Sequence, residues 1–214
     1  MEKEKTLQKI ENSGLVAVIR LQNEDKLANI IEALSDGGVK SLEITMTTPG
    51  AIKIIDNITD QLEDDFIVGV GSVLDSETAV AAIHAGAEFV VSPILKEEII
   101  QAAHRYGKVV VPGAFSPNEA IRAWEMGADV VKIFPASNLG PKYLKNIHGP
   151  MPQIKLSPTG GVNKENAADY IKYGASFLGV GSALLDKDMI KNNDWDALKN
   201  NAQKFINIIN KARN

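Results

Sequence analysis

The sequence predicts an α/β fold, namely a small single-domain (β/α)8 TIM barrel that spans residues 1–214 and carries an extra N-terminal helix. Short apolar segments alternate with helical patterns along the chain. Several helical patterns end in a small residue and a glycine that lead directly into the next apolar segment, as in "AGAEFVVSP" and "MGADVVKIFP". This alternation is typical of repeated βαβ units, and no low-complexity stretch or flexible linker interrupts it. A doubly wound open sheet is the alternative.

Eight apolar segments are predicted to form the parallel strands. In chain order they are residues 14–20, 41–45, 66–70, 88–92, 109–113, 129–134, 153–158 and 176–181. A glycine stands shortly before most of them, where the residue after a helix commonly adopts the left-handed conformation. These markers are Gly38, Gly86, Gly107, Gly127 and Gly174.

Helical patterns fill the segments between the strands, for example "NEDKLANIIEALSDGG" and "DSETAVAAIHAGA". Asn23, Asp75 and Ser116 stand where helix N-caps are expected. Residues 5–14 are predicted to form the extra helix, residues 163–174 the seventh barrel helix and residues 195–214 the eighth.

The composition limits the classes of function. With 44% hydrophobic and 23% charged residues, the chain resembles an ordinary globular protein. A net charge of −4 without a basic cluster disfavours a nucleic-acid partner. The absence of cysteine excludes disulfides, cysteine zinc sites and thiol catalysis. The charged start and the lack of a long apolar run predict a cytoplasmic protein with no membrane partner.

Three charged residues interrupt the predicted strands, namely Arg20, Glu43 and Lys132. Parallel barrel strands are covered on both faces and should be almost continuously apolar. A buried unpaired charge is costly, so each of these residues needs a partner or a function. All three fall in the C-terminal halves of their strands, the end at which barrels build active sites. The structural alternative is a Lys–Glu pair that bridges barrel layers.

Lys132 stands among valine, isoleucine and phenylalanine in "DVVKIF". Desolvation should lower its pKa and keep the amine neutral, and a neutral amine is a nucleophile towards carbonyl carbon. Schiff-base chemistry also needs a group that moves protons, and Glu43 is the candidate general base.

Glycine turns follow three predicted strands, as "GVGSV" (69–73), "SPTGGV" (157–162) and "GVGSALL" (179–185). The last two occupy the positions at which barrels commonly bind phosphate through backbone N–H groups. The sequence therefore predicts phosphate contacts at Gly160, Gly161, Gly181 and Ser182.

These motifs, in this order, resemble the bacterial 2-keto-3-deoxy-6-phosphogluconate / 4-hydroxy-2-oxoglutarate aldolases. The matching segments are "LEITMTTPGA", "VGVGSVL", "FVVSP", "VVPGAFSPNEA", "VKIFPA" and "PTGGV". The resemblance implies a class I pyruvate aldolase that acts on a 2-keto-3-deoxy acid, without metal or cofactor, as a homotrimer. It implies Lys132 as the Schiff-base lysine, Glu43 as the acid/base and Ser72 as a ligand of the pyruvyl carboxylate. Further pocket residues would be Pro93, Pro112, Phe134 and Thr159.

The chain departs from this family at Thr47, where well-studied members carry an arginine that binds the carboxylate. Arg20 stands at the end of the first strand, where those members are apolar. Both positions fall at neighbouring strand ends. We therefore expect Arg20 to take over the carboxylate, beside Ser72 and Thr47.

Other functions were weighed against this one. A metal-dependent aldolase needs clustered ligands, whereas His84 and His104 fall on predicted outer helices and His148 in a predicted loop. A different phosphate-binding barrel, or a non-catalytic sugar-phosphate binder, would not explain Lys132 together with Glu43. Preference for the epimeric 2-keto-3-deoxy-6-phosphogalactonate stays open.

Overall fold

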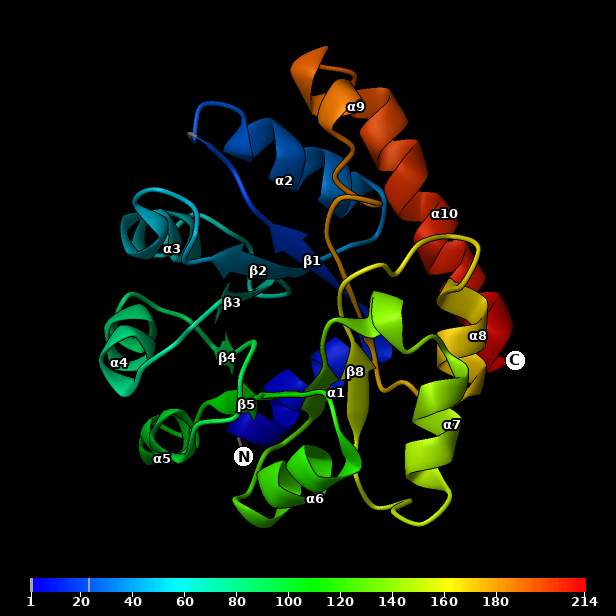
Figure 1. Ribbon diagram of the computed structural model, residues 1–214. Helices are drawn as coiled ribbons and strands as arrows, with labels where there is room; N and C mark the ends of the chain where they lie inside the picture. The colour runs from blue at the N-terminus through cyan, green and yellow to red at the C-terminus, as the bar shows by residue number, and fades with distance from the viewer. Residues whose placement is uncertain (1, 23) are drawn as a thin grey trace.

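The computed structural model describes residues 2–22 and 24–214 and has an α/β fold (Figure 1). Parallel strands curl around a common centre, as in a TIM barrel, and helices lie outside them. Hydrogen bonding gives two sheets, with strand orders β5-β4-β3-β2-β1-β9 and β6-β7-β8. The predicted α/β class is confirmed. Asn23, a predicted N-cap, lies outside the described residues.

Each strand lies inside its predicted segment or extends at most one residue beyond it, and the last three strands begin two or three residues later than predicted. They are β1 (Leu15–Ile19), β2 (Ser41–Thr45), β3 (Ile67–Gly71), β4 (Phe89–Val91), β5 (Val109–Val111), β6 (Gly113–Ala114), β7 (Val131–Ile133), β8 (Leu156–Pro158) and β9 (Leu178–Val180). The predicted strand over 109–113 is divided into β5 and β6 at Pro112, which has no N–H to donate to a ladder.

Helices follow most of the strands, and their bounds are α1 (Glu2–Ser13), α2 (Leu27–Asp36), α3 (Ala51–Thr59), α4 (Ser76–His84), α5 (Glu97–Arg105), α6 (Pro117–Glu125), the 3-10 turn η1 (Ala136–Asn138), α7 (Lys142–His148), α8 (Ala167–Lys172), α9 (Lys187–Lys191) and α10 (Trp195–Arg213). The predicted caps are confirmed at Asp75, which accepts from Thr78 N at 2.6 Å, and at Ser116, which forms a capping box with Glu119. Helix α8 begins at Ala167 rather than at residue 163, because Asn163 and Asn166 form a turn in which each side-chain oxygen accepts from the backbone N–H of the other.

The marker glycines before the strands adopt the predicted left-handed conformation. Their φ values are +87° for Gly38, +101° for Gly86, +64° for Gly107, +94° for Gly127 and +96° for Gly174. The helix-to-strand turns of the repeated unit are therefore as the sequence predicts.

Alternate strand residues divide the core into two parts. One part packs between the strands and the outer helices. The other lies inside the curled sheet and includes Val16, Phe89, Val111 and Phe177. Ile10 of α1 belongs to this inner part and is fully buried, so α1 packs against one end of the curled strands. In the described part of the chain, no helix is long and apolar enough to cross a membrane.

Candidate active site

The type of residue at the inward-facing positions changes along the strands. Near α1 they are large and apolar, as the inner core shows. Towards the C-terminal ends the same alternation gives polar or small residues, namely Arg20 after β1, Glu43 and Thr45 in β2, Gly69 and Gly71 in β3, Lys132 in β7, and Gly179 and Gly181 along β9. The space inside the curled strands is therefore filled by apolar side chains at one end and lined by polar and small residues at the other.

Glu43 is buried, with 3% of its surface exposed, and its ladder partners are Val18 and Gly69. Its side chain leans over the neighbouring strand. A Cβ atom added at Gly71 would lie 1.8 Å from Glu43 Oε1, so the glycine leaves the space that the carboxyl group occupies. The sequence "GVG" in β3 thus makes room for the candidate general base.

Lys132 is 4% exposed and pairs with Gly113 on one side and Ser157 on the other. Its backbone N–H donates to the Pro112 carbonyl at 2.9 Å. Its Nζ atom lies 5.0 Å from the centre of the Phe134 ring. The amine therefore lies on the inward face of β7, next to an aromatic ring.

The two buried groups perturb each other. Burial lowers the pKa of Lys132. The negative charge of Glu43 opposes this shift, and the positive charge of Arg20 adds to it. Burial raises the pKa of Glu43, against the opposing charges of Lys132 and Arg20. Among the described residues, neither side chain forms a hydrogen bond or ion pair. The alternative of a structural Lys–Glu pair is thus not supported, and an amine with a lowered pKa shares the site with a carboxyl group whose pKa is raised.

Arg20 was expected among buried charges, and this expectation is wrong because the residue follows Ile19, the last residue of β1, and is exposed. Its position is nevertheless fixed. The next residue, Leu21, donates its N–H to Thr48 Oγ1 at 3.1 Å, which ties the end of β1 to the loop after β2. Thr47 lies in that loop, and its hydroxyl pairs with that of Thr45 at 2.9 Å.

The loops after β3, β8 and β9 carry the other predicted ligands. Ser72 has φ +59°, in the left-handed region that residues other than glycine seldom adopt. Gly160 and Gly161 also have positive φ, at +87° and +79°. Gly181 O accepts from Leu184 N and Leu185 N, which forms a helical turn. Within the described residues, the N–H groups of Gly161, Ser182 and Ala183 have no protein acceptor, so they are available to an anion.

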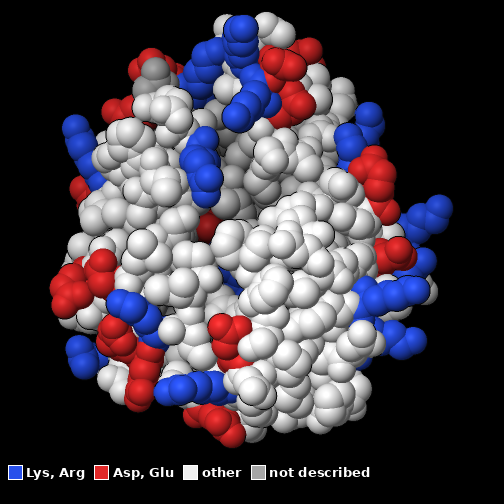
Figure 2. Space-filling model, viewed as in Figure 1, with Lys and Arg blue, Asp and Glu red and all other residues white. Residues whose placement is uncertain are grey.

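The remaining predicted pocket residues divide into two groups. Thr159 is brought into the barrel, since a Cβ atom at Gly179 would lie 2.3 Å from its Oγ1. Phe134 lies beside the amine, and Pro93 follows β4 on the inward alternation. Pro112 lies at an outward-facing position, and its carbonyl oxygen accepts the backbone N–H of Lys132. Figure 2 shows a hollow near the centre of this face, with acidic and basic atoms in its depth.

Comparison with known proteins identifies the family. A family model described as "Aldolase: KDPG and KHG aldolase" matches residues 7–201. The chain belongs to this aldolase family. The 2-dehydro-3-deoxy-phosphogluconate aldolase of Haemophilus influenzae is 32% identical over 204 residues, which cover 95% of this chain and 96% of that protein. The 2-dehydro-3-deoxy-6-phosphogalactonate aldolase of Escherichia coli K12 is 35% identical over 171 residues, covering 79% and 83%.

Solved structures agree with this assignment. The crystal structure of KDPG aldolase from Legionella pneumophila, with pyruvate captured at low pH as a covalent carbinolamine intermediate, has a TM-score of 0.85 at 30% identity. The match covers 92% of this chain and 96% of that chain. The resemblance drawn from the motifs is confirmed, and the chain is an aldolase, that is, a lyase.

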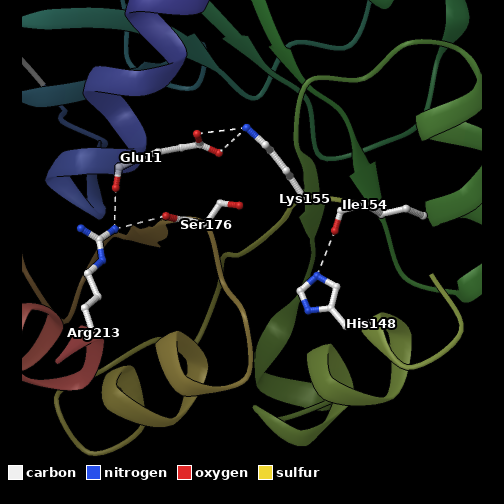
Figure 3. Close-up of polar contacts among 6 residues, drawn as sticks. All are labelled: Glu11, His148, Ile154, Lys155, Ser176 and Arg213. Carbon is white, nitrogen blue, oxygen red and sulfur yellow. Dashed lines mark hydrogen bonds and ion pairs between the residues drawn. The ribbon is translucent and has the colours of Figure 1, made fainter. Parts of the chain in front are cut away.

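The histidines of this aldolase lie outside the site. His84 and His104 are on α4 and α5, as predicted. The prediction for His148 is wrong, because it is the last residue of α7 rather than a loop residue. Its ring nitrogens lie 2.9 Å from Ile154 O and 3.3 Å from Tyr173 O, which gives it a structural role (Figure 3). In the described part of the chain, no group of three or more His, Cys, Asp and Glu residues could hold a metal ion.

Two buried hydroxyl groups of the aldolase were missed by the sequence reasoning. Thr45 follows Glu43 on the inward face of β2, and Ser157 is the ladder partner of Lys132. The signal that could have found them is the period of two along each strand. That period places a residue two positions from a catalytic one on the same face.

Proposed function

We propose that this protein is a metal-independent class I aldolase in which Lys132 forms a Schiff base with a 2-keto-4-hydroxy acid. The observation that carries the proposal is that two buried groups, Lys132 and Glu43, perturb each other's pKa and have no hydrogen-bond or ion-pair partner among the described residues. A binding protein has no use for such an amine. The covalent carbinolamine in the Legionella pneumophila relative supports the same chemistry.

In the cleavage direction, the neutral Lys132 amine attacks the C2 ketone, and the carbinolamine loses water to give an iminium ion. The Glu43 carboxylate, directly or through water, then takes the proton of the C4 hydroxyl as the C3–C4 bond breaks. The electron pair of that bond moves into the iminium group and leaves an enamine, while the aldehyde departs. Protonation of the enamine at C3 and hydrolysis release pyruvate and restore the amine.

The proposed substrates are 2-keto-3-deoxy-6-phosphogluconate, which gives pyruvate and glyceraldehyde 3-phosphate, and 4-hydroxy-2-oxoglutarate, which gives pyruvate and glyoxylate. The N–H groups of Gly161 and Ser182, which have no acceptor among the described residues, would bind the phosphate of the larger substrate, next to Gly160 and Gly181. The epimeric phosphogalactonate is a second candidate, favoured by the 35% identity to an aldolase for that compound. Comparison of kcat/KM for the three compounds decides among them.

Arg20 is the proposed anchor of the substrate carboxylate. Its charge lowers the pKa of both Glu43 and Lys132, which supports a position on the same side of the molecule as the reacting groups. The bond from Leu21 N to Thr48 Oγ1 holds the backbone beside Thr47, the position of the missing arginine. Ser72 and Thr47 would add hydroxyl or backbone contacts to the same carboxylate.

We also infer that the two sheets close into a single (β/α)8 barrel. Isolated parallel bridges link Leu156 to Ala175 and Thr159 to Gly179, across the gap between β8 and β9. On the other side, β5 and β6 follow one another around Pro112 as halves of one strand. Helix α1 would then be the extra N-terminal helix of a single barrel domain.

A homotrimer is the proposed assembly, with contacts near the barrel mouth. Large apolar side chains are exposed after three consecutive parallel strands: Leu74 at 53%, Ile94 at 39% and Phe115 at 43%. Exposed apolar side chains gathered on one side of a mouth commonly mark an interaction surface.

Incubation with pyruvate and borohydride tests the proposed function. Reduction should trap a pyruvyl adduct, and mass spectrometry should find it on Lys132. Lys155, an exposed lysine paired with Glu11, is the internal control and should stay unmodified. Activity should be insensitive to EDTA. Absence of an adduct on Lys132 would overturn the proposal.

A further inference from the structure

Nine polar or charged residues are buried in the described part of the chain. Six have hydrogen-bond partners: Thr6 bonds to Glu88, Ser41 to Ser13, Thr45 to Thr47, Thr48 to Leu21 N, Ser92 to Ile94 N, and Asn201 to the carbonyls of Ala183 and Leu184. Three have none among the described residues, namely Glu43, Lys132 and Ser157. The unpartnered set thus consists of the proposed catalytic pair and one serine that the proposed mechanism does not use.

Ser157 faces the same space as the other two. It is the ladder partner of Lys132, and partners in a parallel ladder point to the same face of the sheet. Its residue exposure is only 1%. Within the described residues, however, no side-chain nitrogen or oxygen is both sealed from solvent and without a partner. The oxygen of Ser157 is therefore not sealed from solvent, and it lies on the inward face that carries Lys132.

Three unsatisfied polar groups around one cavity match the needs of a bound water, which typically makes about three hydrogen bonds to otherwise unpaired buried groups. We propose that Ser157 is a positioning residue that holds a water molecule beside Lys132 and Glu43, and that this is the water lost and regained at C2. The inference rests on the proposed Schiff-base function.

The reaction balances around such a water. When the Schiff base forms, the N–C2 bond is made and the C2–O bond breaks. The departing oxygen takes one proton from the amine and one from protonated Glu43. Hydrolysis reverses these steps. Ser157 keeps its own proton throughout, and its hydroxyl only orients the water, so its loss should slow the exchange of water at C2 without affecting the steps at C3.

Two exchange reactions of pyruvate separate these steps. Loss of an oxygen-18 label from the C2 carbonyl requires complete formation and hydrolysis of the Schiff base. Exchange of the methyl protons in heavy water reports reversible enamine formation, which repeats within one Schiff-base lifetime. In Ser157→Ala, the rate of label loss relative to methyl exchange should fall about tenfold, the effect of one lost hydrogen bond. An enzyme-free sample corrects for spontaneous hydration.

Matched variants define the outcome. Ser41→Ala removes another buried serine hydroxyl from β2, one that is bonded to Ser13, and should leave the ratio unchanged. Ser157→Thr returns a hydroxyl and should restore the ratio. An unchanged ratio in Ser157→Ala, or an equal fall of both rates, would overturn the role of Ser157. Absence of a borohydride adduct on wild-type Lys132 would instead overturn the proposed function itself.

Discussion

The burial of Lys132 lowers the stability of the fold, because its lowered pKa means that it gives up a proton on folding. The unfolded chain therefore binds more protons than the folded one at pH values between the lowered pKa and the ordinary value of about 10.4. Across that window the free energy of unfolding rises with pH. The amine is kept neutral at the expense of stability at lower pH.

Replacement of this lysine should separate chemistry from stability. Lys132→Met should abolish the pyruvate adduct and turnover. It should also raise the free energy of unfolding at neutral pH by about 1–4 kcal/mol, because methionine has no proton to give up on folding. Urea unfolding at several pH values measures the effect. The increase should shrink as pH rises through the window. The exposed control Lys155→Met should be near neutral, and a destabilised Lys132→Met would contradict this account.

Arg20 is the residue on which carboxylate binding should depend. Arg20→Ala removes a charge-assisted contact and should raise KM for the substrate about 10- to 100-fold. Since Arg20 helps to lower the pKa of Lys132, the acid limb of the kcat/KM profile should also move to higher pH. The double variant Arg20→Ala/Thr47→Arg should recover part of the loss. An unchanged KM in Arg20→Ala would show that the carboxylate binds elsewhere.

Strand β3 shapes the site because its glycine residues have no side chains. A Cβ atom at Gly71 would collide with the Glu43 carboxyl group, while the extended backbone itself accepts alanine. Gly71→Ala should therefore fold but lower kcat about 100-fold or more by displacing the general base. Gly149→Ala is the control, because its added Cβ meets atoms only at 3.7 Å. A Gly71→Ala variant with normal kcat would place Glu43 outside the mechanism.

The strands could be read from the sequence because apolar runs and glycine-ended helices repeat regularly. Lys132 and Glu43 were found for the related reason that a charge is conspicuous in such a run. Arg20 was misplaced because its exposure depends on β1 ending at Ile19, which no local pattern fixes. Ser157 was missed because a serine in a strand is ordinary. Only its missing partner, a property of the folded chain, makes it unusual.

Helix α1 belongs to the end of the barrel that serves stability. Arg213 donates to the carbonyls of Glu11 and Asn12, and Lys155 pairs with Glu11, so polar contacts hold the helix in place (Figure 3). Ile10→Ala should lower the free energy of unfolding by about 2–5 kcal/mol while kcat stays unchanged. Denaturant unfolding beside steady-state assays tests this. A fall in kcat at constant stability would contradict the division of the molecule into a stabilising end and a reactive end.

The whole molecule thus has a packed end and a reactive end, and the reactive end also carries exposed apolar side chains. A chain of 23.1 kDa should sediment as a trimer if these side chains form the subunit contact. Leu74 and Phe115 extend from the loops after β3 and β6, so the contact would lie beside the substrate entrance. Assembly and activity should then be coupled.

Phe115→Glu and Leu74→Glu should dissociate the assembly, because each places a charge in an apolar contact. Analytical ultracentrifugation should show monomers, and kcat/KM should fall as the loops at the mouth lose their support. Trp124→Glu, on the outer helix α6 and 42% exposed in the monomer, is the control and should keep the trimer. Dissociation by Trp124→Glu with intact trimers in the other two variants would move the interface to the outer helices. It would also leave each active site independent of its neighbours.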